Sequence, residues 1–441
     1  MARWMSMVLV LVVSLAVYAD DARFDVAYSE KLDAATFLNA ISDEPRFNGS
    51  WEELRKVWRP RIEADHEAAP AFGRWLGRGI QLGYLLSVLP EDDLDDVIAR
   101  LEKPEEALAA IEQGIDEPAY QMVFRDLKAD MEGVRTILAF LKKEGFLEMR
   151  AKDHQPTLDA ARAVLEETLK GIDAEQFAAW LEAFTGRAVP EGRMRIYVLA
   201  FSKPLSFQLA GFAIGWSGDH EGMARILAHE FLHKLNPSAE NVASMERLAG
   251  KDAFYGEAFE RIYGEFHEGR EEEIVEASAR FVIQAMGLIT PVRNLRSMKF
   301  EFFSEKTRTG GVPLAAILFE ELSKAHVVPG ELDYDAFIEK VLEGLEAGGI
   351  EERYKQVIRP VAGTAGMVLR EDGTVERVFE GYPAAEGSLQ AGDALVEVNA
   401  ARVAGLNRED VLDLLAGEPG TPINLLVRRS AEEVRLQFKL R

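Results

Sequence analysis

A five-residue pattern near the middle of the chain restricts its local fold and chemistry more than any other feature. Residues 225–237 read RILAHEFLHKLNP, in which His229, Glu230 and His233 form an H-E-x-x-H sequence. Residues four apart share one face of a helix, so a helix here places both imidazoles on the same side. That spacing allows two histidines to bind one Zn²⁺, with Glu230 placed to act as general base on a metal-bound water. The alternative is a helix whose histidines are only polar and solvated.

A catalytic zinc site needs three protein ligands, so the two histidines leave the site incomplete. No third histidine follows at the spacing of the longer H-E-x-x-H-x-x-G-x-x-H motif. The acid-rich segment 270–286 (REEEIVEASARFVIQAM) is the obvious source of a third ligand. Glu272 and Glu276 lie four apart on one face of a helix, so we expect Glu272 to be the ligand, then Glu276, then Glu273. The alternative is a run of acids stabilised by the helix dipole.

A peptidase site also needs a hydrogen-bond donor that stabilises the oxyanion. The candidates downstream of the motif are Tyr263 and His326, and also Tyr255 and His267. Upstream, residues 194–201 and 207–216 are rich in strand-forming residues. An edge strand in this position can bind an extended peptide beside the metal. The alternative is that these strands form an ordinary core sheet.

The N-terminal half is predicted to be helical and carries no recognisable chemistry. Apolar residues recur at helical spacing through most of residues 34–185, which gives a helical region over residues 20–190. Residues 191–350 then form the expected metal-binding domain, and Gly348-Gly349 suggests its end.

Charge and leader sequence restrict the partners and the compartment. With 51 Lys and Arg against 75 Asp and Glu, the net charge is −24, which argues against nucleic acid as the main partner. Residues 1–19 combine Arg3, an apolar run at 7–17 and a small-residue end, as in a cleavable signal peptide. The run is too short for a stable membrane span. The absence of cysteine excludes disulfides, and an exported protein without them fits a bacterial periplasm.

From about residue 360 the pattern changes to short strands with frequent turns. The segment 382–399 (YPAAEGSLQAGDALVEVN) is its most specific part, and residues 360–441 strongly resemble a PDZ domain. The resemblance implies a groove between a strand and a helix that takes an extended peptide or a free C-terminus. By position, the carboxylate-binding loop would be Thr364, Ala365, Gly366 and Met367. The alternative is a small β domain that only rigidifies the chain.

The middle region resembles a gluzincin, a zinc peptidase with H-E-x-x-H followed by a downstream glutamate. Together the two resemblances imply a multidomain chain with a mostly α N-terminal region, an α+β zincin-like catalytic domain and a β-rich PDZ domain. The expected function is zinc-dependent hydrolysis of peptides or unfolded envelope proteins, with peptide termini bound at the PDZ groove. The rival hypothesis is a PDZ-bearing scaffold or adaptor whose zinc site is structural or inactive. A zinc hydrolase acting on other substrates is a third.

Overall fold

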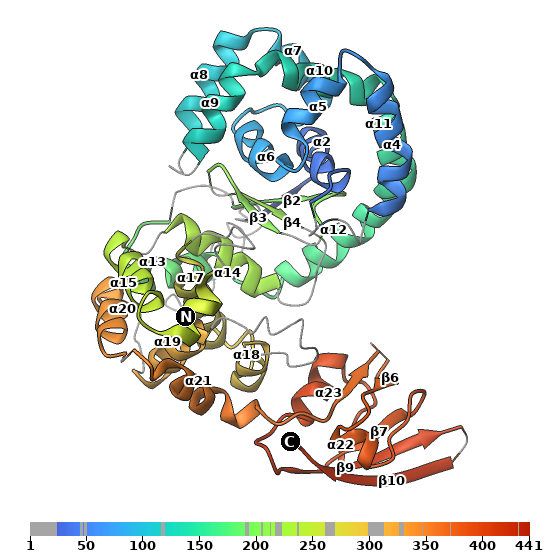
Figure 1. Cartoon of the computed structure of the whole chain (residues 1–441), viewed down its shortest axis with the longest axis vertical. Coiled ribbons are helices and arrows are strands. Elements are labelled where there is room, and N and C mark those ends of the chain that lie inside the picture. Colours follow the sequence, from blue (N-terminus) through green and yellow to red (C-terminus); the bar gives the residue numbers. More distant parts are fainter. Residues whose placement is uncertain are drawn as a thin grey trace, which may run out of the picture. The chain divides into compact units, whose positions relative to one another are not determined.

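The computed structural model describes most of the chain beyond its first 23 residues. The described residues are 24–44, 47, 51–115, 120–189, 194–203, 206–211, 213–216, 223–235, 238–260, 270–298, 313–325, 330–345, 347–370, 372–430 and 432–441. The predicted signal segment, residues 1–19, therefore lies outside them. The described chain is mostly helical with a C-terminal β region, as predicted (Figure 1). None of its described helices has the length and apolarity needed to cross a membrane.

Contacts divide the chain into two compact units, and the first is built around a four-stranded sheet. This unit comprises Met1–Ala179 and Ala188–Lys234. The strand order is β1-β2-β4-β3, in which β2 runs parallel to both β1 and β4, and β3 runs antiparallel to β4 at one edge. The strands are β1 (Phe24–Ala27), β2 (Met194–Val198), β3 (Phe207–Leu209) and β4 (Ala213–Trp216).

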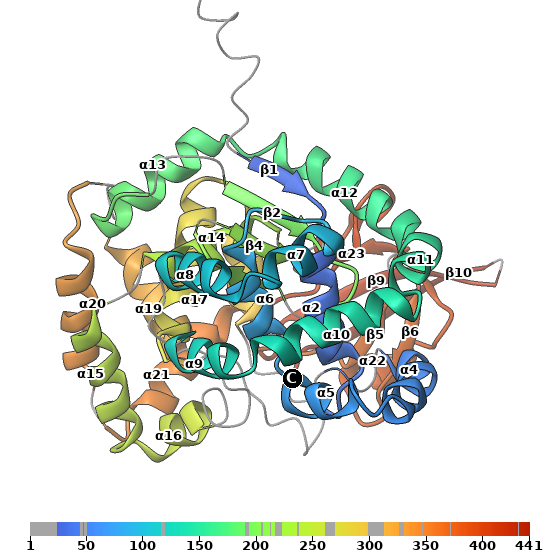
Figure 2. The ribbon, with the colours of Figure 1, turned by 90° about the horizontal axis from the view of Figure 1, so that it is seen from above.

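Helices cover both faces of this sheet. On one face, α2 and α6 pack over an apolar cluster that contains Leu32, Tyr197 and Phe207. On the other, the ring of Phe24 lies 6.4 Å from that of Phe177 in α13, which lies 6.3 Å from Phe231 in α14. The helix α12 packs along β1 and β2 (Figure 2). The helices are α2 (Glu30–Ala40), α4 (Glu52–Ala64), α5 (Ala69–Trp75), α6 (Gly79–Ser87), α7 (Leu94–Leu101), α8 (Pro104–Gly114), α9 (Gln121–Ala129), α10 (Met131–Lys143), α11 (Phe146–Met149), α12 (Gln155–Leu169), α13 (Ala174–Thr185) and α14 (Met223–Lys234).

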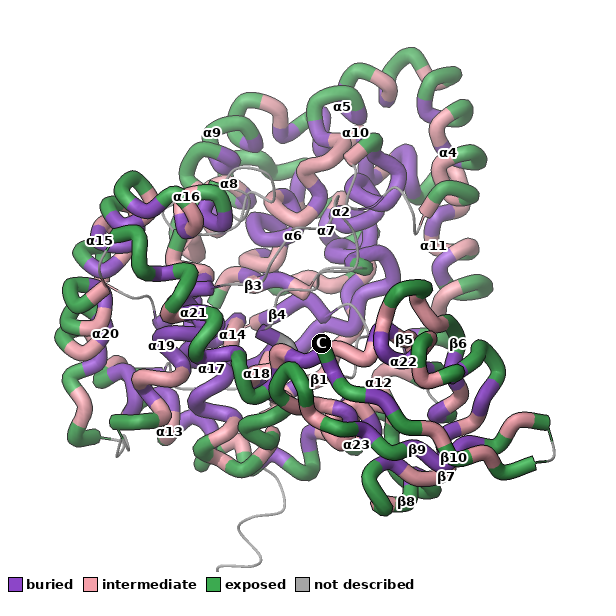
Figure 3. The backbone as a smooth tube through the Cα atoms, turned by 60° about the horizontal axis from the view of Figure 1, so that its bottom comes forward, coloured by how far each residue is buried: buried purple, intermediate pink, exposed green. Residues whose placement is uncertain are grey.

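The most buried helix, α2, carries a buried ion pair. Figure 3 shows α2 buried along its length, whereas outer helices such as α4 alternate between buried and exposed residues. Asp33 is fully buried and accepts a hydrogen bond of 2.5 Å from Nε of Arg150, in the π-helical turn Arg150–His154, and one of 2.6 Å from the backbone N–H of Ala200. Burial raises the pKa of Asp33 to about 6, although Arg150 opposes the shift. The pair therefore fixes α2 to two segments more than a hundred residues away.

Removing one member of this pair is expected to destabilise the first unit strongly. Asp33→Ala leaves Arg150 buried without its counter-charge, which costs about 3–5 kcal/mol of unfolding free energy. Adding Arg150→Met should recover part of this loss, because it removes the uncompensated charge. Urea denaturation of both variants followed by circular dichroism checks the prediction. Equal loss in the single and double variants would contradict it.

The second unit comprises Trp180–Arg187 and Leu235–Arg441. Its central helix is α17, buried continuously from Glu273 to Ile283 and packed most closely against α19. The end of α13 joins this core, because the Phe184 ring lies 5.4 Å from Phe281. The helices of this unit, together with the 3₁₀ turn Arg359–Val361, are α15 (Ala239–Ala249), α16 (Ala253–Phe259), α17 (Glu272–Ala285), α18 (Pro291–Ser297), α19 (Pro313–Lys324), α20 (Tyr334–Glu343) and α21 (Ile350–Ile358).

The C-terminal β region of this unit contains two sheets around one apolar core. One sheet has the order β10-β9-β7-β8, and the other pairs β5 with β6. Buried residues such as Val398, Val411 and Ile423 form the core. The elements are β5 (Met367–Leu369), β6 (Val375–Val378), α22 (Pro383–Glu386), β7 (Ala394–Val398), β8 (Ala401–Arg402), α23 (Arg408–Leu414), β9 (Pro422–Arg429) and β10 (Glu432–Lys439).

Ion pairs join this β region to the helices before it. Arg293 of α18 lies 2.7 Å from Asp410 and 3.5 Å from Asp413, both in α23. Arg296 lies 2.9 Å from Asp413 and also pairs with Glu409. These arginines therefore neutralise the acidic face of α23.

The compact units differ from the domains predicted at 20–190 and 191–350. β1 pairs with β2 residue by residue from Phe24 with Met194 to Ala27 with Tyr197. The predicted strands and α14 therefore belong to the same unit as the N-terminal helices, while the acid-rich helix α17 belongs to the other. A four-residue strand has too weak a sequence pattern to be detected, which is why β1 was not predicted.

Candidate metal centre

Helix α14 contains the H-E-x-x-H pattern and is held by its apolar residues. Ile226, Leu227 and Phe231 are buried, and the spacing of Leu227 and Phe231 puts them on one face. The cationic end of Lys234 lies 5.1 Å from the centre of the Tyr84 ring, which ties the last turn to α6. The helix is thus fixed by packing on both sides of the histidines.

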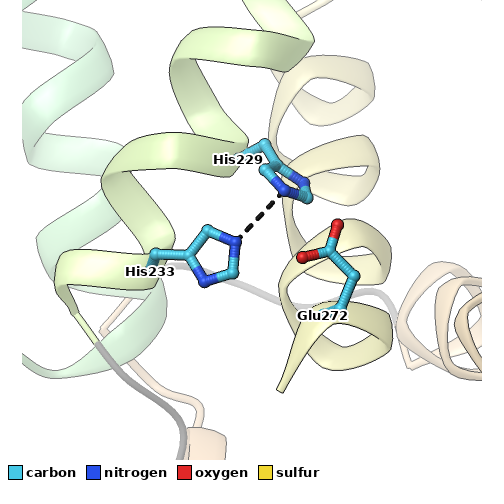
Figure 4. A group of neighbouring side chains, drawn as sticks. All are labelled: His229, His233 and Glu272. Atoms are coloured by element: carbon cyan, nitrogen blue, oxygen red, sulfur yellow. Dashed lines mark hydrogen bonds between the residues drawn. The ribbon is translucent and has the colours of Figure 1, made fainter. Parts of the chain in front are cut away.

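The two histidine side chains lie against each other in a T-shaped arrangement. Nε2 of His229 lies 3.2 Å from Nε2 of His233, and the rings are nearly perpendicular at 78° (Figure 4). Two nitrogens bound to one tetrahedral zinc at 2.0–2.1 Å would lie about 3.3–3.4 Å apart. The observed separation therefore fits a pair of ligands to a single ion.

Glu272 is the third side chain of this group. It comes from the first turn of α17, and Figure 4 shows its carboxylate directed toward the imidazoles. One ligand atom from each of His229, His233 and Glu272 lies within 4.8 Å of the others. This limit is longer than the spacing of ligands in a filled site, but it puts the carboxylate within reach of the same ion. The donor set, two imidazoles and one carboxylate, is that of a zinc site with an open position.

The structure directs Glu273 away from this group. Its carboxylate is fully buried and accepts hydrogen bonds from the backbone N–H groups of Leu314, at 2.8 Å, and Ala315, at 3.2 Å. These donors belong to the N-terminus of α19, where a carboxylate is stabilised by unpaired N–H groups. Burial raises the pKa of Glu273 to about 7, and these hydrogen bonds oppose the shift. Glu273, the third choice as a metal ligand, instead caps a neighbouring helix.

Glu276, the second choice as a ligand, forms a buried ion pair with Arg280. Its Oε1 accepts a hydrogen bond of 2.8 Å from Nε of Arg280, one turn further along α17. The i,i+4 spacing of the two residues could have indicated this pair in the sequence, but was not recognised there. Arg280 in turn accepts, through its carbonyl, a hydrogen bond of 3.0 Å from the buried Asn294 of α18.

Glu230 is buried beside the two histidines on α14, with 8% of its surface exposed. Its position next to His229 keeps it within the same turn as the candidate ligands. The expected proton donors Tyr263 and His326, and also His267, lie outside the described residues. Tyr255 is fully buried on α16, where its hydroxyl opposes the rise in the pKa of Glu273. Tyr255 is thus part of the core around α17.

The three-residue group predicts which substitutions weaken zinc binding. Glu272→Ala should lower zinc affinity by more than about 100-fold, since even loss of an outer partner costs about 10–100-fold. Glu271→Ala is the matched control, because this acid precedes Glu272 in the chain and is not part of the group. Isothermal titration with Zn²⁺ checks both variants. Equal affinities for the two variants would show that Glu272 is not a ligand.

The predicted peptide-binding loop of the β region is partly engaged in the fold. The backbone N–H of Thr364 donates to the carbonyl of Arg441 at 2.9 Å, so it cannot serve a bound carboxylate. The carbonyls of Ala365 and Gly366 accept hydrogen bonds from Ala384 and Phe379. Gly366 has a φ of +76°, and Met367 begins β5. The loop is therefore fixed in place, with one donor fewer than expected.

Comparison with known proteins identifies the C-terminal region. Residues 374–429 match the PDZ domain family, which confirms that resemblance. Among solved structures, the chain is similar to an aminopeptidase N family protein from Idiomarina loihiensis, with 10% identity and a TM-score of 0.24 over 65% of this chain and 63% of that protein. The chain thus spans less than two thirds of that protein's length, and so low a likeness does not indicate a shared fold. A search of curated proteins finds no match.

Proposed function

We propose that this chain is a zinc-dependent peptidase with a C-terminal PDZ domain that binds peptide or protein termini. The observation that carries the proposal is the 3.2 Å separation of the His229 and His233 Nε2 atoms, with the Glu272 carboxylate in reach of both. Function must be argued from such a site, because the fold alone does not imply it. We also propose that its catalytic region is of the gluzincin type.

The chemistry follows from the side chains of α14 and α17. When bound by His229, His233 and Glu272, zinc would polarise the scissile carbonyl and make water more acidic. Glu230 takes a proton from the attacking water and delivers it to the leaving amine.

The PDZ domain supplies a second place for peptide binding. In the described part of this region, β5 pairs with β6 and has no second strand neighbour, so an extended peptide can add along its other edge. We propose that the substrates are peptides or unfolded proteins of the cell envelope, because residues 1–19 have the pattern of an export signal. The periplasm is the proposed compartment.

Glu230→Gln is expected to abolish peptide hydrolysis while leaving zinc bound. Loss of a general base lowers kcat by about 10²–10⁴-fold, and the isosteric amide keeps the packing of α14. Zinc content by elemental analysis and cleavage of a mixed peptide library check the two parts. Unchanged cleavage in the variant would refute the role of Glu230. Zinc binding without any cleavage by the unaltered protein would favour the scaffold hypothesis.

Gly366→Ala is expected to impair peptide binding by the PDZ domain. An added Cβ would lie 2.1 Å from Cβ of Tyr382, at a backbone conformation that favours glycine, so the loop before β5 must shift. Gly405→Ala is the control, with a similar φ of +87° but no atom within 4 Å. Fluorescence polarisation should show affinity for C-terminal peptides falling roughly tenfold or more in the first variant. The control should retain it, and equal affinities would contradict the assignment.

A further inference from the structure

The sheet of the first unit has one face covered by α2 and α6, and its other face is apolar except at one position. Strand residues that are register partners share a face, and those two apart along a strand share it too. Gln208 of β3 is the partner of Ile214 in β4, which is the partner of Ile196 in β2. The other members of this row are fully buried and apolar: Met194, Ile196, Val198, Ile214 and Trp216. Gln208 therefore places an amide at the edge of an otherwise apolar surface.

This face is the one that packs against the histidine helix. Phe24 belongs to it, because Phe24 is the register partner of Met194. The ring contacts from Phe24 to Phe177 and on to Phe231 lead directly to α14, two residues from each candidate ligand histidine. The strand β3 also contacts α14. The neighbours of Gln208, Phe207 and Leu209, point instead to the core with Leu32 and Tyr197.

The side-chain amide of Gln208 has an unused hydrogen-bonding group. Its Oε1 is buried and has no hydrogen-bond partner anywhere in the described chain, while the residue as a whole is only half-buried. A buried polar oxygen without a partner is rare and costs the free energy of its lost hydration. An apolar residue would match the rest of the row at no such cost. The amide of Gln208 is therefore free to form a hydrogen bond with a ligand at the edge of the sheet, which an apolar residue could not do.

We propose that Gln208 is a substrate-binding residue, whose amide forms hydrogen bonds with a backbone peptide group of the substrate beside α14. A peptide group offers one N–H and one carbonyl, which match the acceptor and donor of a glutamine side chain. The edge position of β3 suits an extended peptide, whose backbone groups point along the sheet. This inference rests on the proposed peptidase function and identifies how its substrate is held.

The test replaces Gln208 by leucine, with methionine as a second apolar variant of similar length. Each should raise KM for peptide cleavage about tenfold with kcat little changed, because binding to the ground state and transition state weakens equally. Each should also weaken binding of C-terminally amidated peptides to the zinc-loaded Glu230→Gln protein by the same factor. The melting temperature should be equal or higher, because no unpaired polar oxygen remains buried.

Gln81→Leu is the matched control. Gln81 of α6 also has a buried Oε1 without a hydrogen-bond partner among the described residues, but it lies on a helix that covers the opposite face of the sheet. Its replacement should leave KM and peptide binding unchanged. An equal rise in KM in the Gln81 and Gln208 variants would overturn the proposal.

The remaining outcomes separate this inference from the proposed function. Cleavage by the unaltered protein with unchanged KM and binding in both Gln208 variants would overturn the role of Gln208 and leave the peptidase proposal intact. Peptide binding that depends on Gln208 without cleavage would support the role of Gln208 and overturn the catalytic proposal. A fall in melting temperature with unchanged peptide affinity would show a structural role. Absence of both binding and cleavage would overturn both proposals.

Discussion

The parallel pairing of β1 with β2 is the constraint on which the first unit depends. It joins Phe24–Ala27 to Met194–Val198, so the described residues between them belong to one long connection that is mostly helical. The sheet that results provides the apolar face on which α13 and α14 pack. The ion pair of Asp33 with Arg150, and the hydrogen bond to Ala200, hold the helices over the other face. A parallel pair with so long a connection is costly in loop-closure entropy, and the buried contacts of α2 offset that cost.

The acids at the start of α17 illustrate how surroundings assign different tasks to identical side chains. Glu272 faces the histidines, Glu273 caps α19, and Glu276 pairs with Arg280. A buried charge without hydrogen bonds or a counter-charge is strongly unfavourable. The buried carboxylate of Glu273 therefore accepts backbone hydrogen bonds, and that of Glu276 has a counter-charge. The hydrogen bonds of Glu273 to α19 also hold the first turn of α17, from which Glu272 projects.

The PDZ domain is joined to the same helix system by charge. Arg293 and Arg296 of α18 bind the acids of α23, and Asn294 of α18 donates to the carbonyl of Arg280 and to the side chain of Gln284 in α17. The acidic side of α23 is therefore already occupied by these arginines.

The sequence by itself determined the chemistry that is available. The spacing of His229 and His233 places them on a common face because helical geometry repeats every 3.6 residues, and the segment 382–399 carried the resemblance to a PDZ domain that the family match confirms. The sequence also limited the candidates for the third metal ligand to three glutamates. Only the tertiary structure shows that the carboxylate of Glu273 caps the N-terminus of α19, whereas the i,i+4 spacing of Glu276 and Arg280 is already present in the sequence. The tertiary structure was also needed to identify β1, because its partner strand lies about 170 residues away in the sequence. It was needed for Gln208 as well, because only the structure shows that its side-chain oxygen is buried without a hydrogen-bond partner among the described residues. Local periodicity records which face a residue occupies, whereas the identity of the group opposite it is decided by packing between distant segments.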